Sequence, residues 1–257
     1  MCFYRSVSSA AFALMTSLGC AALTAEENAS GEPKSAAELR SEAVTALHEG
    51  DSTVAVKAAD TLVEHHADQA SARLLAADVY LRCGRFKEAV KWFDRYLELA
   101  PESLPGLWQR GIALYFVRDY KRGAAQFEEH RKVNPHDVEN AAWHFLCVAK
   151  LDSIDKARRM VLPAPNDPRL PMEEVLAMLS SGDSESVRKR MEALPAGSAA
   201  RRQADFYGNF YLGLHADAKG DRGQALHWLR QSAAEAPHHY MGDIARVYVV
   251  FLENEQR

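Results

Sequence analysis

The sequence predicts an all-α fold in which antiparallel helical hairpins stack into a right-handed superhelix. Three observations predict it. Landmark residues recur at intervals of 34, since Gly50 is followed by Gly84 and Pro101 by Pro135. Small residues recur at matching positions on the first and second helix of each hairpin, where the two helices must touch. Prolines close successive second helices, because proline has no N–H group and a fixed φ. Together these features indicate a solenoid of repeated helical pairs.

A 34-residue period is the length of the tetratricopeptide repeat, a unit of two antiparallel helices. Residues 70–135 match this repeat in nearly every constrained position. The residues that we expect to define the repeats by their small size or by ending a helix are Ala77, Gly84, Ala89, Pro101, Gly111, Gly123, Pro135, Gly213, Ala225 and Pro237.

The flanking repeats are degenerate. Residues 36–67 keep the small positions but lack the aromatic residues and the closing proline. Residues 138–162 are expected to form a helical pair without the turn glycine. Four prolines between Pro163 and Pro171 predict an irregular connection after it.

The C-terminal part continues the solenoid, which we place at residues 36–254. Residues 171–194 predict another helical pair, broken at a Gly-Asp dipeptide, and a clear repeat returns at 206–237. Residues 240–254 predict an amphipathic capping helix that covers the exposed end of the stack.

The N-terminus has the composition of a secretory signal peptide, which we place at residues 1–25. A lone basic residue, Arg5, precedes a run without any charge that ends at Ala25. Signal peptidase could cut after Ala25. Alternatively, the tripeptide that ends at Cys20 resembles the end of a lipoprotein box, in which case Cys20 would be lipidated. Residues 26–35 are expected to be a flexible tether.

Composition and motifs argue against several function classes. The formal net charge of −4 disfavours a nucleic-acid-binding protein. The sequence after residue 25 has no apolar stretch of the ~20 residues that a membrane helix needs. It shows no nucleophile elbow, P-loop or Cys/His set with metal-ligand spacing. We therefore expect no enzyme, no cofactor and no metal site, and the adjacent histidines at 65–66 and 238–239 to be helix-end or solvated residues.

Four stretches in order resemble the NlpI-type periplasmic lipoproteins of bacteria, over most of residues 70–252. They are residues 110–137, 141–150, 173–194 and 205–229. The resemblance implies a dimeric outer-membrane adaptor in the periplasm that binds a PDZ-containing protease and presents peptidoglycan hydrolases to it. The imperfect lipoprotein box and the shorter region before the first repeat depart from that family, and leave the anchoring and the mode of dimerisation open.

The first helices of tetratricopeptide repeats line a concave groove, which is the usual peptide site. The residues that we expect at groove-facing positions are Trp108, Ile112, Tyr115, Phe116, Asp78, Arg82, Tyr207 and Phe210. Aromatic side chains contribute much of the binding energy in protein interfaces. The alternative is that the aromatic residues pack against the first helix of the next hairpin.

These expectations together predict a non-catalytic adaptor or scaffold of the bacterial cell envelope, exported and periplasmic, which holds a protease or cell-wall hydrolase together with its substrate. The alternative is a structural subunit of a secretion or outer-membrane assembly machine. The expected partners are proteins or peptides, and not nucleic acid. A membrane would be contacted only through a lipid on Cys20.

Overall fold

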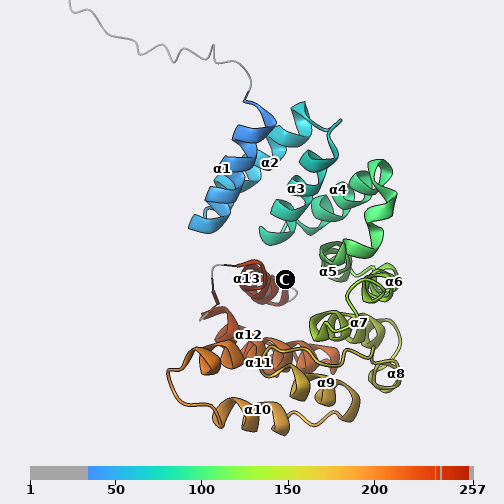
Figure 1. Ribbon diagram of the computed structural model, residues 1–257, viewed down its shortest axis with the longest axis vertical. Coiled ribbons are helices and arrows are strands. Elements are labelled where there is room, and N and C mark those ends of the chain that lie inside the picture. Colours follow the sequence, from blue (N-terminus) through green and yellow to red (C-terminus); the bar gives the residue numbers. More distant parts are fainter. Residues whose placement is uncertain (1–33, 235, 238, 255–257) are drawn as a thin grey trace, which may run out of the picture. The chain divides into compact units, whose positions relative to one another are not determined.

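The structure is a computed structural model that describes residues 34–234, 236–237 and 239–254 (Figure 1). The chain divides into two units, residues 1–34 and 35–257, and all the helices below belong to the second. The signal peptide expected at 1–25, with Cys20, and most of the expected tether lie outside the described residues. None of the described helices is both long enough and apolar enough to cross a membrane.

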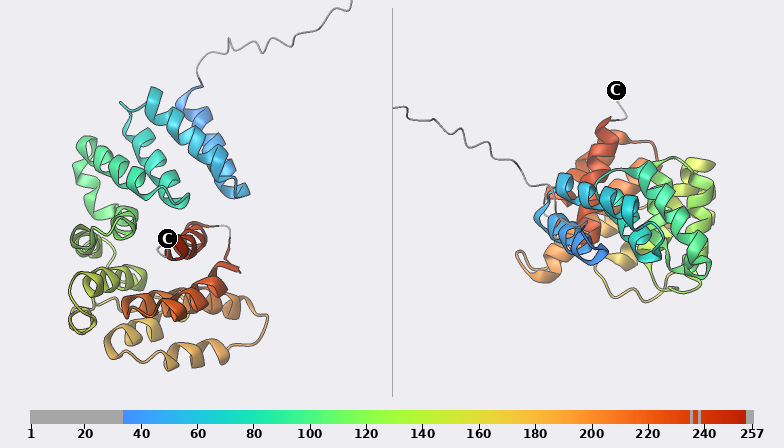
Figure 2. Two further views of the ribbon diagram at one scale, coloured as in Figure 1. Left: turned by 180° about the vertical axis from the view of Figure 1, so that it is seen from behind. Right: turned by 90° about the horizontal axis from the view of Figure 1, so that it is seen from above.

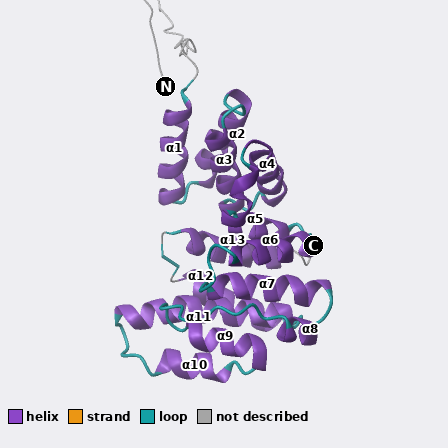
Figure 3. Cartoon of the chain, turned by 45° about the vertical axis from the view of Figure 1, so that its right-hand side comes forward, coloured by secondary structure: helices purple, strands orange, loops and turns teal. Residues whose placement is uncertain are grey.

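Helices make up the regular secondary structure of the described residues, and they follow one another as antiparallel pairs (Figure 3). The first three pairs are α1 (Ala36–Glu49) with α2 (Ser52–His65), α3 (Ala70–Arg82) with α4 (Phe86–Leu99), and α5 (Trp108–Phe116) with α6 (Tyr120–Arg131). The later elements are α7 (Val138–Leu151), α8 (Ile154–Arg159), α9 (Met172–Ser181), α10 (Glu185–Glu192), α11 (Ala199–Ala218), α12 (Arg222–Ala234) and α13 (Tyr240–Asn254). The predicted fold class, a tetratricopeptide-type helical-hairpin solenoid, is confirmed.

The first hairpin shows how local sequence sets the helix ends. Ser35 and Glu38 form a capping box at the start of α1, in which each side chain bonds the backbone N–H of the other. Gly50 ends α1 with a φ of 78°, a left-handed conformation that costs glycine little. Asp51 then caps α2 by accepting hydrogen bonds from the N–H groups of Thr53 and Val54.

Glycines lie where the two helices of a pair approach each other most closely. A Cβ atom at Gly111 on α5 would lie 2.6 Å from Cζ of Phe127 on α6. A Cβ at Gly213 on α11 would lie 2.6 Å from Cγ of Leu229 on α12. Real Cβ atoms do not approach other atoms this closely, so both contacts require a residue without a side chain.

Two elements differ from a regular repeat. A 3₁₀ helix, η1 (Pro101–Gly106), precedes α5 and leaves α5 only nine residues long. Pro105 lies inside η1, where it lacks an N–H group and disfavours the α conformation of the residue before it. Helix α11 begins at Ala199, seven residues before the start expected for the repeat at 206–237. Ser198 caps this earlier start by accepting a hydrogen bond from the N–H of Arg201.

The proline-rich connection before α9 is irregular, as expected, and a partly buried charge cluster fixes it to the start of α7. The guanidinium of Arg169 bonds Asp167 at 2.6 Å and Asp137 at 2.7 Å, and it also pairs with Glu139. Asp167 accepts a further hydrogen bond from the N–H of Val138 at 3.1 Å. The connection therefore has a defined position on the solenoid.

The C-terminal helix α13 has the predicted bounds, but it does more than cover the end of the stack. It packs against α12 and also against α3, from the opposite part of the solenoid. Figures 1 and 2 show α13 inside the arc that the other helices form. The concave side of the solenoid is therefore occupied by the chain itself.

Candidate binding pocket beside helix α13

The aromatic residues expected in an open groove are covered by α13. Tyr115 and Phe116 on α5 are 2% and 4% exposed. The Phe116 ring lies 5.2 Å from the ring of Tyr248 and 5.0 Å from that of Phe251, both on α13. Trp108, at the start of α5, contacts Tyr240 edge-on at 4.8 Å. These side chains do face the concave side, but they form a core with α13.

The buried carboxylate of Asp217 links α13 to three other helices. Asp217 at the end of α11 accepts hydrogen bonds from the hydroxyl groups of Tyr115 on α5 and Tyr248 on α13. Its other oxygen lies 2.7 Å from the ammonium nitrogen of Lys150 on α7. Burial and the negative charge of Asp217 raise the pKa of both tyrosines well above 10, so the hydroxyl groups remain donors.

A second charged cluster holds the N-terminal half of α13 to α3. Asp243 on α13 bonds Arg82 at 2.6 Å and Arg246 at 2.6 Å, one arginine on each side. Asp78, one turn before Arg82, lies 3.6 Å from the Arg82 guanidinium. Burial raises the pKa of Asp78 to about 6, although the charge of Arg82 opposes this.

The expectation of an open peptide groove is therefore wrong at these positions. Ile112 and Phe210 are fully buried, and Phe210 lies within 6.3 Å of the Tyr248 ring. Tyr207 is not part of the core around α13. Its ring lies 5.6 Å from the guanidinium carbon of Arg169, at the proline-rich connection. The expected groove residues separate into a filled concave core and a structural cluster outside it.

The residues of α13 that fill the groove were not singled out from the sequence. Ile244, Tyr248 and Leu252 recur every four residues and are at most 1% exposed. This spacing marks one apolar face of a helix, but it does not identify the surface that the face contacts. Tyr248 on that face was the available signal.

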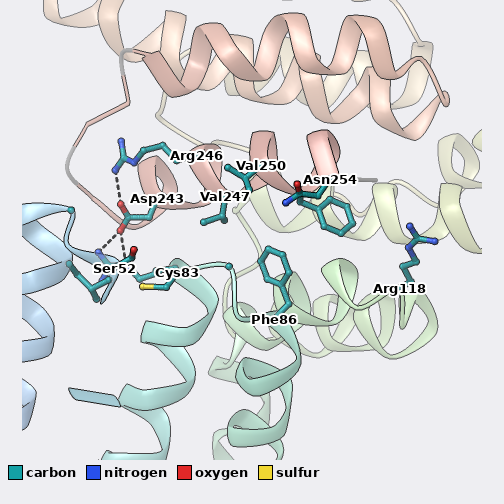
Figure 4. Close-up of a pocket in the computed structure, with 14 residues that line it drawn as sticks. Ser52, Cys83, Phe86, Arg118, Asp243, Arg246, Val247, Val250 and Asn254 are labelled. Carbon is teal, nitrogen blue, oxygen red and sulfur yellow. Dashed lines mark hydrogen bonds and ion pairs between the residues drawn. The ribbon is translucent and has the colours of Figure 1, made fainter. Parts of the chain in front are cut away.

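A pocket of about 610 Å³ remains beside α13, between this helix and the turns of the first three hairpins (Figure 4). Its apolar wall consists of Val247, Val250 and Phe251 from α13, opposite Cys83 and Phe86 from the second hairpin. Val250 is 54% exposed, so its side chain is open to solvent. An apolar cavity of this size is typical of a ligand site.

The turn residues of the three hairpins line this pocket at equivalent repeat positions. Gly50, Gly84 and Arg118 follow one another at intervals of 34 residues, and all three contribute to the pocket. All three have positive φ angles, of 78°, 75° and 64°. The third hairpin thus has an exposed arginine at a left-handed turn position that glycine occupies in the first two hairpins.

The described residues contain no group of three or more His, Cys, Asp or Glu side chains that could hold a metal ion. Burial raises the pKa of the Cys83 thiol at the pocket to about 11, so it remains protonated near neutral pH. The lining of the pocket consists of apolar surface and charged side chains.

Comparisons with known proteins agree with the fold. The sequence profile of a tetratricopeptide repeat family matches residues 40–103, which run from within α1 through α4 to the start of η1. The Protein SGT1 homolog of Bos taurus is 29% identical over 102 residues, which are 40% of this chain and 30% of that protein. The chain thus matches less than a third of the length of this relative. Tetratricopeptide domains generally mediate protein–protein interactions, and neither comparison indicates an enzyme family.

Proposed function

We propose that this protein is a non-catalytic adaptor that holds other proteins, and that the pocket beside α13 is where a partner inserts apolar side chains. The observation that supports this most directly is the combination of a filled concave face with an open apolar pocket at its edge. A repeat solenoid whose usual peptide groove is filled still offers this pocket, lined by the turns of three consecutive hairpins.

Binding at the pocket does not require α13 to move. Displacing α13 would expose the rings of Tyr115, Phe116 and Tyr248 together with the carboxylate of Asp217. Exposing one such buried aromatic side chain costs about 1.5–3 kcal/mol. Val250, by contrast, is already exposed and becomes buried when a partner binds.

We place this adaptor in the bacterial cell envelope, exported to the periplasm and anchored to the outer membrane if Cys20 is lipidated. The support is the uncharged run from Ser6 to Ala25 and the resemblance to the NlpI-type lipoproteins. An envelope protease and peptidoglycan hydrolases are the partners that we propose on the same grounds, with a homodimer as the assembly. N-terminal sequencing of native protein tests the export, and an intact Met1 in a cytosolic fraction would contradict it.

Site-specific photo-crosslinking in native cells tests the adaptor function. A photoreactive phenylalanine analogue replaces Val250 at the pocket in one strain, and Val133 after α6 in another. Val133 is a matched control because it is 58% exposed and lies outside the pocket. We expect a discrete crosslinked protein from position 250, identified by mass spectrometry, and none from position 133. Recovery of no protein from either position would contradict the proposal.

A further inference from the structure

We infer that a groove between α10 and α12 is a second binding site, which takes an extended, uncharged peptide segment that carries an apolar side chain. This inference rests on the proposed adaptor function, because a protein that holds two others together needs two separate sites. The groove shares no lining residue with the pocket beside α13.

Two adjoining hollows form this groove, which we call the α10–α12 groove. They measure about 390 and 270 Å³ and share Arg188 on α10 and Trp228 on α12. The floor is one stripe of α11 that runs from Arg201 to Lys219, just after the last residue of the helix. At about 1.5 Å per residue this floor is about 27 Å long. An extended peptide of about eight residues has the same length.

Glycine contacts hold both walls of the α10–α12 groove on its floor. A Cβ atom at Gly208 would overlap the side chain of Met191 on α10, and one at Gly213 would lie 2.6 Å from Cγ of Leu229 on α12. Both helices therefore pack tightly on α11. The N-terminal extension of α11 supplies Arg201 to the floor. The groove thus exists before a partner binds, which reduces the entropic cost of binding.

Two buried polar side chains in the floor lack hydrogen-bond partners. Asn209 is 7% exposed and His215 is 3% exposed, and each lines one of the hollows. Oδ1 of Asn209 and Nε2 of His215 bond no other group among the described residues. Burial lowers the pKa of His215 to about 4, so its imidazole is neutral near pH 7. Since buried polar atoms are almost always paired, these two atoms are positions for hydrogen bonds to a ligand.

The polar atoms match the backbone of a peptide. Oδ1 of Asn209 only accepts hydrogen bonds, whereas a nitrogen of a neutral imidazole either donates or accepts one. An extended backbone offers N–H and C=O groups at regular intervals along the floor. Trp228, half-buried between the two hollows, offers an apolar ring against which a side chain of the segment packs.

The charges of the groove favour an uncharged segment. Its lining has three basic and three acidic side chains, which are Arg188, Arg201, Lys219, Glu192, Asp205 and Asp221. Arg201 pairs with Asp205 at 2.7 Å. Arg188 pairs with Glu185, which also lies on α10. Because the signs balance, the groove attracts neither acidic nor basic segments.

A display library of random octapeptides, selected for binding to the full-length protein, tests the inference. We expect a class of octapeptides that binds Trp228→Ala at least tenfold more weakly than the wild type. Trp92→Ala on α4 is the matched control, because Trp92 is also half-buried and lines neither hollow. This class should be uncharged, contain an apolar residue, and bind Val250→Ser like the wild type.

Asn209→Leu separates binding from stability. Leucine has a similar volume and removes the unpaired oxygen, so the melting temperature should stay the same or rise. The affinity for the selected octapeptides should fall about fivefold, as for the loss of one hydrogen bond. Methylation of the backbone nitrogen that bonds Asn209 should weaken binding to the wild type by the same factor, and should not weaken binding to Asn209→Leu further.

Several results would overturn the inference. Selection of no octapeptide, or only of octapeptides that bind Trp228→Ala as well as the wild type, would show that the groove is not a peptide site. A selected class with a net charge would contradict the uncharged character of the segment. Full affinity with a lower melting temperature in Asn209→Leu would make Asn209 a structural residue. If a partner still crosslinks at position 250 after any of these results, the adaptor function stands and only the second site is wrong.

Discussion

The hydroxyl group of Tyr248 on α13 donates a hydrogen bond to Oδ2 of Asp217 on α11, with the two oxygens 2.5 Å apart. The same carboxylate also binds Tyr115 and Lys150, so the last helix is fixed to three helices of the solenoid through one buried charge. Polar contacts as well as aromatic packing therefore hold α13 in the groove.

Tyr248→Phe should destabilise the protein by about 1.5–3 kcal/mol, the usual cost of losing a hydrogen bond to a charged group. The phenylalanine ring keeps the stacking on Trp143 at 5.8 Å, so packing is little changed. Urea unfolding followed by circular dichroism measures the difference. Tyr96→Phe is the control, because it removes a neutral, half-buried hydrogen bond to Ser103 and should cost less. A Tyr248→Phe variant as stable as the control would contradict the role of Asp217.

Gly111→Leu should destabilise the protein by about 1–3 kcal/mol through overpacking. The added side chain would start 2.6 Å from the Phe127 ring, which itself is 1% exposed and cannot move into solvent. Thermal unfolding provides the measurement. Gly106→Ala is the matched control, since no atom lies within 4 Å of the Cβ it would add. A wild-type melting temperature for Gly111→Leu would show that the contact between α5 and α6 is looser than described.

Arg118→Gly should leave the protein as stable as the wild type, or more stable by up to about 1 kcal/mol. Glycine removes the steric cost of the positive φ, and this gain outweighs or balances the greater flexibility of the unfolded chain. Gly84→Ala at the equivalent turn should have the opposite effect and cost about 1 kcal/mol. Denaturant titrations of both variants check the pair. Loss of stability in Arg118→Gly would assign this residue a structural role.

Glu139→Gln should change how stability depends on pH. Burial raises the pKa of Glu139 from its usual 4.5 to about 7, against the opposing charge of Arg169. Between these two values the folded state binds a proton that the unfolded state has lost, so the contribution of Glu139 to stability falls as pH rises through this window. The glutamine variant mimics the protonated form. It should match the wild type near pH 4.5 and be more stable by about 1–3 kcal/mol at pH 8.

Unfolding free energies measured at several pH values between 4.5 and 8 test this expectation. Glu129→Gln on α6 is a suitable control, because Glu129 pairs with Lys132 at the surface. Parallel pH profiles for the wild type and Glu139→Gln would mean that Glu139 is ionised throughout this range, and that Arg169 outweighs the effect of burial.

The sequence determined the helical pairs because the contacts that define them are local. Gly111 meets Phe127 sixteen residues later, and such a contact recurs whenever a 34-residue unit repeats. Turn glycines at 50 and 84 and the closing prolines set the helix ends by their own backbone preferences. The bounds of α13 followed from its amphipathic pattern in the same way.

The tertiary structure alone decided where α13 packs and what it leaves open. Tyr248 lies beside Tyr115, 133 residues away in the chain, with 3.1 Å between their hydroxyl oxygens. An amphipathic pattern shows that one face of a helix is buried, but several aromatic surfaces of the solenoid could have buried it. The curvature of the stack brings α3, α5, α7 and α11 around α13, and that curvature is the sum of small rotations between successive hairpins. For this reason the expected groove is a core, and the pocket lies at its edge.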